Sequence, residues 1–470
     1  MIKWLIMKKK IITGILLTAL SSACSEWVNV TPKQEVESNK LFESEIGFNS
    51  ARIGIYGRMT LTNNYGKTLT YGAIEQLVQR YDNYGTNVPT DASRAEIYDY
   101  KNNGTGRSIV NNVWLQSFRT IANINSLLWR LDNGGRKVIA SEDTWNQMKG
   151  EALGLRAFHY LDLLRLYGPV YSENPSLRCL PWRDEVNADS KDLLPADSIA
   201  MYIIEDLRSA ESLLQKEEKL TVMSSNEWRK HYMNLWAVKA LMARTYLWIG
   251  DKANAADKAR EVIEKSGLEL ATDNREDVSM YNETIFCLGM DDMEEKLKSD
   301  WADKTTFSNE LYISLDNLQD VFEYRAGPGT TDIRYLNRQG FIHGTNGTLC
   351  RKYLGTELRY MEKVPLIRLA EMYYILAESV SLEESVGYIN EVRNKRGIGR
   401  IYNLVADVSY DEAARTDALN KEYQKEFFAE GQWFYFLKRN NCRTFYRCPV
   451  NDMRLYYVLP TPDDEIEYRK

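Results

Sequence analysis

Two stretches of the chain combine aromatic rings with amide and charged side chains, a mixture suited to binding a sugar. A pyranose ring has an apolar face of C–H groups that stacks on an aromatic ring, and polar side chains bond its hydroxyls. The candidate residues lie in segments 79–106 and 291–312, and they are Tyr81, Tyr84, Arg94, Tyr98, Tyr100, Trp301 and Phe307. The alternative for each is ordinary packing of a loop onto the scaffold.

Catalytic chemistry has no comparable signal in the sequence. A glycosidase needs two carboxylates about 5 to 10 Å apart, and among 66 acidic residues no pair stands out. His159, His231 and His343 show no metal-ligand spacing and no serine or cysteine nucleophile motif. Residues 183–192 are acidic but lack the spacing and the glycine of a calcium loop. We therefore expect no enzyme activity, no cofactor and no metal, with His159 as a structural residue.

Charge and cysteine content restrict the partners. The net charge is −6, and removing residues 1–23 takes away four lysines and no acid, which leaves −10. A negative chain without long basic runs argues against nucleic acid as a partner. Five cysteines lie beyond Cys24, without zinc or redox spacing, and Cys442 with Cys448 is the only local disulfide candidate.

Long amphipathic helices must carry the candidate loops. In residues 234–267, apolar side chains recur at helical spacing on either side of Gly250. The small residues Ala240, Ala243 and Ala256 would let two antiparallel helices approach closely, and the pair resembles a tetratricopeptide repeat. Similar patterns predict helices over 113–133, 148–168, 197–215, 365–379 and 383–397.

Loop-rich stretches separate these helical units. They cover roughly residues 60–110, 168–196, 268–362 and 398–410. Helical repeats usually stack without a break, so function is expected in the insertions. The β-prone run Thr284 to Leu288 predicts a few strands in the third of them. The fold class is thus mainly α, with tetratricopeptide-like helix pairs, loop-rich insertions and a few short strands.

The pattern of residues at the start of the chain indicates an export signal. Three lysines precede the apolar run 11–20, which is too short to span a bilayer, and small residues follow. Met1 and Met7 are alternative starts. Cys24 directly after the small residues resembles a bacterial lipobox, although Ser21 stands where an apolar residue is usual. An incidental cysteine behind an ordinary secretory signal is the alternative. We expect Cys24 to be lipidated, because several acyl chains give stable anchoring.

Several motifs in order resemble the SusD/RagB family of outer-membrane nutrient-binding lipoproteins of Bacteroidota. They are "LRAFHYLDLLRLYGPVY" (155–171), "ETIFCL" (283–288), "KVPLIRLAEMYYILAE" (363–378), "YINEVRNKRGI" (388–398), "KEYQKEFFAEGQWFYFLKRNN" (421–441) and "YVLPTPDDEI" (457–466). Gln432 and Tyr435 depart from the family, which often has Arg and Asp there, and this puts one buried ion pair in doubt.

The resemblance implies a fold, a role and a partner. Family members hold a glycan, or in some cases a peptide, above a SusC-type TonB-dependent barrel transporter, and ligand-binding aromatics often precede the helix expected near Val113. We expect a lipid-anchored, non-catalytic glycan-binding protein at the outer-membrane surface, attached to the membrane only through its lipid. Peptide or another nutrient is the alternative ligand, and a glycoside hydrolase is a more distant one. The expected parts are a signal peptide (1–23), a lipidated tether (24–40) and a single domain (41–470) with halves of about 41–270 and 271–470.

Overall fold

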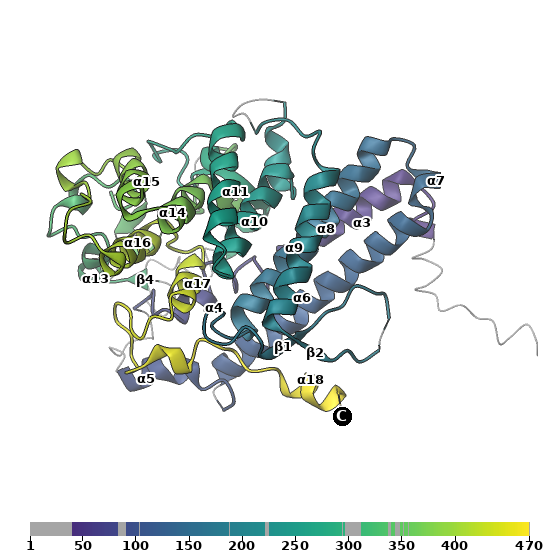
Figure 1. Cartoon of the computed structure of the whole chain (residues 1–470), viewed down its shortest axis with the longest axis horizontal. Helices are drawn as coiled ribbons and strands as arrows, with labels where there is room; N and C mark the ends of the chain where they lie inside the picture. Colours follow the sequence, from purple (N-terminus) through teal and green to yellow (C-terminus); the bar gives the residue numbers. More distant parts are fainter. Residues whose placement is uncertain are drawn as a thin grey trace, which may run out of the picture.

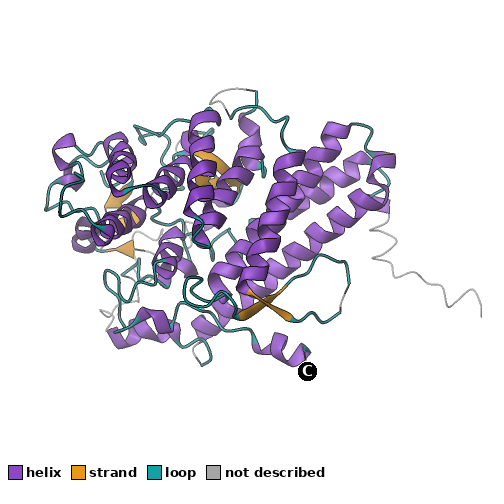
Figure 2. Ribbon diagram, viewed as in Figure 1, coloured by secondary structure: helices purple, strands orange, loops and turns teal. Residues whose placement is uncertain are grey.

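The computed structural model describes residues 40–469 except 83–90, 103, 188, 221–224, 294, 297–311, 337–339, 344–347, 351 and 356. Helices dominate it, as the sequence predicts (Figure 2). No helix within these described ranges has the length and apolar character needed to cross a bilayer.

The longer helices pack side by side largely in chain order, and together they form the elongated body seen in Figure 1. In this array each helix contacts its neighbour: α3 (Glu45–Met59), α6 (Gly104–Arg130), α8 (Glu142–Tyr167), α9 (Ala196–Leu213), α10 (Leu235–Trp248), α11 (Lys252–Lys265), α14 (Leu369–Ser379) and α15 (Leu382–Lys395). The helices α16 (Glu412–Glu426) and α17 (Gln432–Arg439) follow. Successive helices bury their apolar stripes against each other, which is the arrangement of a helical repeat protein.

The predicted tetratricopeptide-like pair is confirmed as α10 and α11. Ala240, Ala243 and Ala256 are all buried where these helices pack. Gly250 makes the turn between them with φ of +83°, a left-handed conformation that glycine adopts without steric cost. Asp251 then caps α11 by accepting a hydrogen bond from the Asn254 amide.

Short elements fill the spaces between the long helices. The helical ones are α4 (Ala73–Gln76), α5 (Asp91–Ala95), η1 (Glu96–Tyr98), η2 (Leu131–Gly135), α7 (Arg136–Val138), η3 (Glu227–His231), η4 (Tyr281–Glu283), α13 (Leu315–Val321), η5 (Pro328–Thr330), η6 (Arg400–Tyr402), η7 (Met453–Leu455) and α18 (Asp463–Tyr468). The strands are β1 (Arg178–Pro181), β2 (Leu193–Pro195), β3 (Thr284–Gly289), β4 (Tyr312–Ile313), β5 (Phe341–His343), β6 (Thr348–Cys350) and β7 (Lys363–Arg368).

The strand pairing partly matches the sequence analysis. The β-prone run at Thr284 is strand β3, as predicted, and it pairs antiparallel with β7. The helix expected over 365–379 begins only at Leu369, because residues 363–368 form β7 against β3. In the 168–196 insertion, β1 pairs with β2, and no strand was expected there.

The start of α6 also differs from the prediction. The helix begins at Gly104, nine residues before Val113. Its first turns contain glycine and asparagine, which are poor helix formers, so propensity alone gave no signal. Burial of Ile109 and Val110 in the core outweighs that cost.

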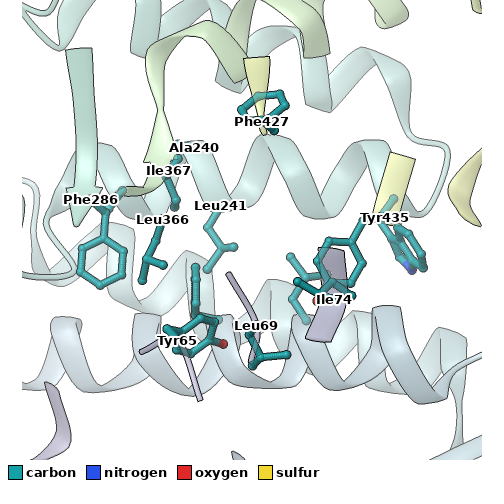
Figure 3. Packing of buried hydrophobic residues seen from close by; sticks show 14 of the residues in the cluster. Tyr65, Leu69, Ile74, Ala240, Leu241, Phe286, Leu366, Ile367, Phe427 and Tyr435 are labelled. Atoms are coloured by element: carbon teal, nitrogen blue, oxygen red, sulfur yellow. The ribbon is translucent and has the colours of Figure 1, made fainter. Parts of the chain in front are cut away.

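One continuous core joins the two halves of the chain. Figure 3 shows residues of segment 65–74 facing α10, the β3–β7 pair and segment 427–435. The departures from the family motif lie here, at Gln432 and Tyr435. Arg165 donates to Gln432 Oε1 over 3.1 Å, lies 3.6 Å from the Tyr435 ring centroid, and pairs with Asp162. The buried guanidinium of Arg165 is therefore still paired, and its acidic partner is Asp162 on the same helix, α8.

A buried ionic cluster holds the C-terminal half together. Arg368, Arg396 and Arg334 converge on Glu426, with N–O distances of 2.5, 2.8 and 2.9 Å. Arg368 and Arg396 also share Glu283, each at 2.8 Å. Burial by itself would raise the pKa of Glu426, but the three guanidiniums outweigh it and hold that pKa well below its usual range. This cluster links η4, β7, α15 and α16.

Candidate functional site

The structure brings the edges of both predicted ligand loops together at Asp82. The Asp82 amide donates to the Tyr312 carbonyl over 2.8 Å. Its carboxylate accepts from the Ser314 amide at 2.5 Å and from Asn317 Nδ2 at 2.8 and 2.9 Å. Asp82 from segment 79–106 and Tyr312 from segment 291–312, far apart in sequence, thus meet on one side of the fold, near β4 in Figure 1.

A third segment, just after α17, completes this junction. Arg447 forms an ion pair with Asp82. The Tyr446 hydroxyl lies 3.0 Å from Asp320 Oδ2 and 3.2 Å from Asn317 Oδ1. We call Asp82, Tyr312, Asn317, Tyr446 and Arg447 the loop junction. Sequence reasoning missed Tyr446 and Arg447, and the only signal available was an aromatic–arginine pair in a loop.

The loop junction offers both a ring and hydrogen-bonding groups. Tyr446 is 36% exposed. Burial, and next the hydrogen bond to Asp320, raise the pKa of Tyr446 to about 12. Burial, and next the charge of Asp82, raise the pKa of Tyr312. Both phenols therefore keep their protons at neutral pH, and the proton of Tyr446 is engaged by Asp320 and Asn317, so its ring is the part it offers to a ligand.

The backbone at this place is strained. Gln79 has φ of +53° and Arg447 has φ of +66°, values that non-glycine residues rarely adopt. Each such residue costs about 1 to 3 kcal/mol, and such residues concentrate at ligand sites. The ion pair to Asp82 helps to hold Arg447 in this conformation.

Three of the predicted aromatic residues are buried below this surface. Tyr81, Tyr98 and Tyr100 are 2, 4 and 9% exposed. Their hydroxyls donate to the carbonyls of residues 71, 77 and 456, each over 2.8 Å. In this conformation they fix the first loop to the scaffold and present no ring face. Direct contact with ligand would require the loop to move, and it stays a prediction.

Of the other predicted site residues, only Arg94 lies within the described part of the chain. Arg94 lies half-buried at the end of α5, and its carbonyl lies 3.3 Å from Gln79 Nε2. Tyr84, Trp301 and Phe307 lie outside the described residues, as does Cys24. Their roles remain predictions.

A groove of about 560 Å³ lies where the second loop leaves the scaffold. It is bordered by the end of α3, by Tyr232 and by Asp291 and Asp292 beyond β3. Lys296 is anchored there, 3.2 Å from the Thr60 carbonyl and 3.0 Å from Asp292. Lys296 at this groove and Tyr312 at the loop junction are the described residues on either side of segment 297–311.

The buried residues His159, His231 and Cys287 show no activated nucleophile. Burial lowers the pKa of both His159 and His231 to about 4, so both imidazoles are neutral at pH 7. His231 Nδ1 lies 3.6 Å from Cys287 Sγ, but burial raises the pKa of that thiol to about 12. A thiol that stays protonated is a poor nucleophile.

The acidic segment 183–192 and the cysteine pair can also be placed. Glu185 is bonded by Lys191 at 3.0 Å and by Asn187 at 2.8 Å, so it is already engaged. Within the described ranges, no group of three or more His, Cys, Asp or Glu is arranged to hold a metal ion. Cys442 and Cys448 are both free thiols.

Comparison with known families gives two overlapping matches. A model described as "Starch-binding associating with outer membrane" matches residues 60–247, and the model of the SusD family matches residues 212–458. A comparison with curated protein sequences gave no match.

Solved structures give the same fold over most of the chain. A SusD superfamily protein from Bacteroides fragilis superposes with a TM-score of 0.70 at 20% identity, covering 91% of this chain and 98% of its own. A SusD-like carbohydrate binding protein from Bacteroides vulgatus has a TM-score of 0.65 at 17% identity, with coverages of 85% and 84%. A laminarin binding SusD-like protein has a TM-score of 0.61 at 17% identity, with coverages of 91% and 98%.

Proposed function

Because the chain belongs to the SusD family, we propose that it is a non-catalytic binding protein which captures a glycan at the outer-membrane surface for import. The observation that carries this proposal is the loop junction. Asp82 and Tyr312, one from each candidate segment, meet there, and Tyr446 adds an exposed ring beside carboxylate, amide and guanidinium groups. The described relatives include carbohydrate and laminarin binders, which supports a glycan as the ligand.

The rest of the proposal concerns attachment and partner. Residues 1–23 would be removed, Cys24 would carry the lipid, residues 24–40 would act as a tether, and 41–470 would form one domain. A SusC-type TonB-dependent barrel would receive the glycan. Replacing Cys24 with alanine is expected to abolish surface labelling of cells that produce the full chain. Unchanged labelling would contradict lipid anchoring at this residue.

The proposed binding of a glycan can be tested by native gel electrophoresis in gels that contain polysaccharide. The protein used is the mature chain with Cys24→Ala, so that no lipid is present. Starch, laminarin, mannan and xylan form the panel, and a casein gel tests the peptide alternative. Retardation by one glycan and none by casein is the expected result. Release of reducing ends from the retarding glycan would favour the hydrolase alternative.

A variant then ties binding to the loop junction. Tyr446→Ala removes the exposed ring and is expected to weaken retardation about tenfold, the effect of losing about 1.4 kcal/mol. Tyr468→Ala is the matched control, because Tyr468 is an exposed tyrosine on α18. Equal retardation of wild type and Tyr446→Ala would refute the assignment of the site.

A further inference from the structure

A second exposed ring lies at a cavity that belongs to neither ligand loop. Trp228, in the short helix η3, is 50% exposed. It borders a cavity of about 260 Å³ between the first turns of α8 and the end of α9. That volume lies just below the range usual for sites of drug-sized ligands, and so it suits one sugar ring.

The indole of Trp228 is held in place from one side. The Arg229 guanidinium lies 5.2 Å from its ring centroid, and Tyr232 meets it at 5.5 Å with an interplanar angle of 82°. Arg229 is itself fixed by ion pairs to Glu151, at 2.6 Å, and to Glu217. A ring that is already fixed loses little conformational entropy when a ligand stacks on it.

The neighbouring tyrosine does not offer the same surface. Two guanidiniums lie over the ring of Tyr232, with Arg52 at 5.0 Å and Arg229 at 5.3 Å from its centroid. The Tyr56 ring approaches it at 5.1 Å and 77°. Trp228 is therefore the stacking platform of this region.

Amide groups surround the platform. Asn146 and Gln147 border the cavity from α8, and Asn226 borders it from the turn before η3. Asn226 Nδ2 donates to Glu218 Oε2 over 2.7 Å, which positions both groups at the rim. Amides and carboxylates both accept hydrogen bonds, and amides also donate, as the hydroxyls of a sugar require.

The charge of the lining excludes an anionic ligand. The acids are Asp143, Glu217 and Glu218, against the cations Lys216 and Arg229. Lys216 is paired with Asp143 at 2.6 Å, and Arg229 with Glu217. Among the described residues that line the cavity, no cation is left over to pair with a uronate or sulfate, and the excess acid repels one.

We propose that this cavity binds one ring of a neutral saccharide, which stacks on Trp228. The site is separate from the loop junction. It touches the first turns of α8, a helix of 26 residues and thus roughly 40 Å long. The segment that carries Tyr446 follows Lys438, whose ammonium bonds the Leu166 carbonyl at the other end of that helix. A long glycan held at both points gains avidity without any new contact.

Fluorine NMR on protein labelled with 5-fluorotryptophan reports on this indole directly. The Trp228 signal is assigned from its loss in Trp228→Phe. Maltohexaose, laminarihexaose, mannohexaose and xylohexaose are the neutral probes, and polygalacturonate is the anionic one. A shift of the Trp228 signal with a neutral probe, and none with polygalacturonate, is expected. No shift with any neutral probe, or a shift with polygalacturonate, would overturn the proposal.

Variants connect that signal to binding. Trp228→Ala is expected to weaken glycan retardation about tenfold, equivalent to about 1.4 kcal/mol. Trp129→Ala is the matched control, because Trp129 on α6 is 49% exposed and lies outside the cavity lining. If Trp228→Ala does not fold, Asn146→Ala keeps the indole and is expected to reduce the NMR-detected affinity by a similar factor. Unchanged affinity in Trp228→Ala, or in Asn146→Ala where it replaces that variant, would overturn the proposal.

The two sites can fail separately. Loss of binding in Tyr446→Ala with an unresponsive Trp228 signal would leave the loop junction and remove the second site. If the Trp228 signal shifts in both wild type and Tyr446→Ala, and the two proteins are retarded equally, the second site would stand and the loop junction would be removed as a binding site.

Discussion

Replacing His159 with leucine is expected to make the stability of this protein less sensitive to acid. His159 lies in the middle of α8 and is fully buried. Neither ring nitrogen has a hydrogen-bond partner among the described protein atoms, and the rings of Phe158 and Tyr65 lie beside it. Burial lowers the pKa of His159 from 6.5 to about 4, because the cost of burying a charged imidazole outweighs the favourable charge of Asp162 nearby.

The magnitude follows from proton linkage. Below pH 6.5 the unfolded chain binds a proton at His159 that the folded chain excludes, so the free energy of unfolding falls as the pH falls towards 4. Each pH unit in that window costs about 1.4 kcal/mol, so wild type is expected to lose about 2 kcal/mol through this residue between about pH 7 and pH 5. Above pH 6.5 the imidazole is neutral in both states and contributes no pH dependence.

Urea unfolding at the two pH values measures the effect, with the free energy extrapolated to zero denaturant. His159→Leu is expected to lose about 2 kcal/mol less than wild type on acidification. Phe158→Leu is the matched control, since it perturbs the adjacent core side chain without removing a titrating group. If wild type and His159→Leu lose the same free energy, the imidazole is not kept neutral, and the reasoning fails.

Two further substitutions test the scaffold. Gly431→Ala is expected to lower the free energy of unfolding by about 3 kcal/mol, because φ is +75° and a Cβ would lie 2.6 Å from Ile74 Cγ2. Glu426→Gln is expected to cost about 3 to 5 kcal/mol, since Arg334, Arg368 and Arg396 keep their buried charges and lose the carboxylate on which all three converge. Urea unfolding measures both.

Each of these has a control of the same chemistry at an open site. Gly54→Ala on α3 meets no atom within 4 Å and is expected to be neutral or to stabilise by up to about 1 kcal/mol. Glu391→Gln removes an exposed pair with Lys395 at 4.0 Å and is expected to change stability by less than about 0.5 kcal/mol. Losses in the controls as large as in the buried variants would contradict the burial argument.

The sequence predicted the helices well where apolar periodicity was strong. The pair α10–α11 and the helices α8 and α9 lie where the stripes of residues 148–168, 197–215 and 234–267 placed them. The prediction of helices failed where the surroundings of a segment override its local apolar pattern. Leu366 and Ile367 continue the apolar run of α14, yet they belong to strand β7. They do so because β3 lies beside them and pairs with them in an antiparallel ladder.

The candidate site shows the same division more sharply. Aromatic residues in a loop-rich stretch predict a binding region, and described residues of both stretches meet at Asp82. Which rings face outward was not readable from the stretch itself. Tyr81, Tyr98 and Tyr100 are buried with bonded hydroxyls, while Tyr446 is the exposed one.

The sequence by itself therefore determined the helical class, the family and the regions where ligand contact is expected, since periodicity and motif order are local properties of the chain. Only the tertiary structure decided which side chains share a surface. Asp82 and Asn317 lie 235 positions apart in the sequence, and the arginine partners of Glu426 in the buried cluster lie 30 to 92 positions from it. Such pairings depend on how the helices pack. Packing energy comes from contacts between different segments, so no single segment of the sequence encodes it.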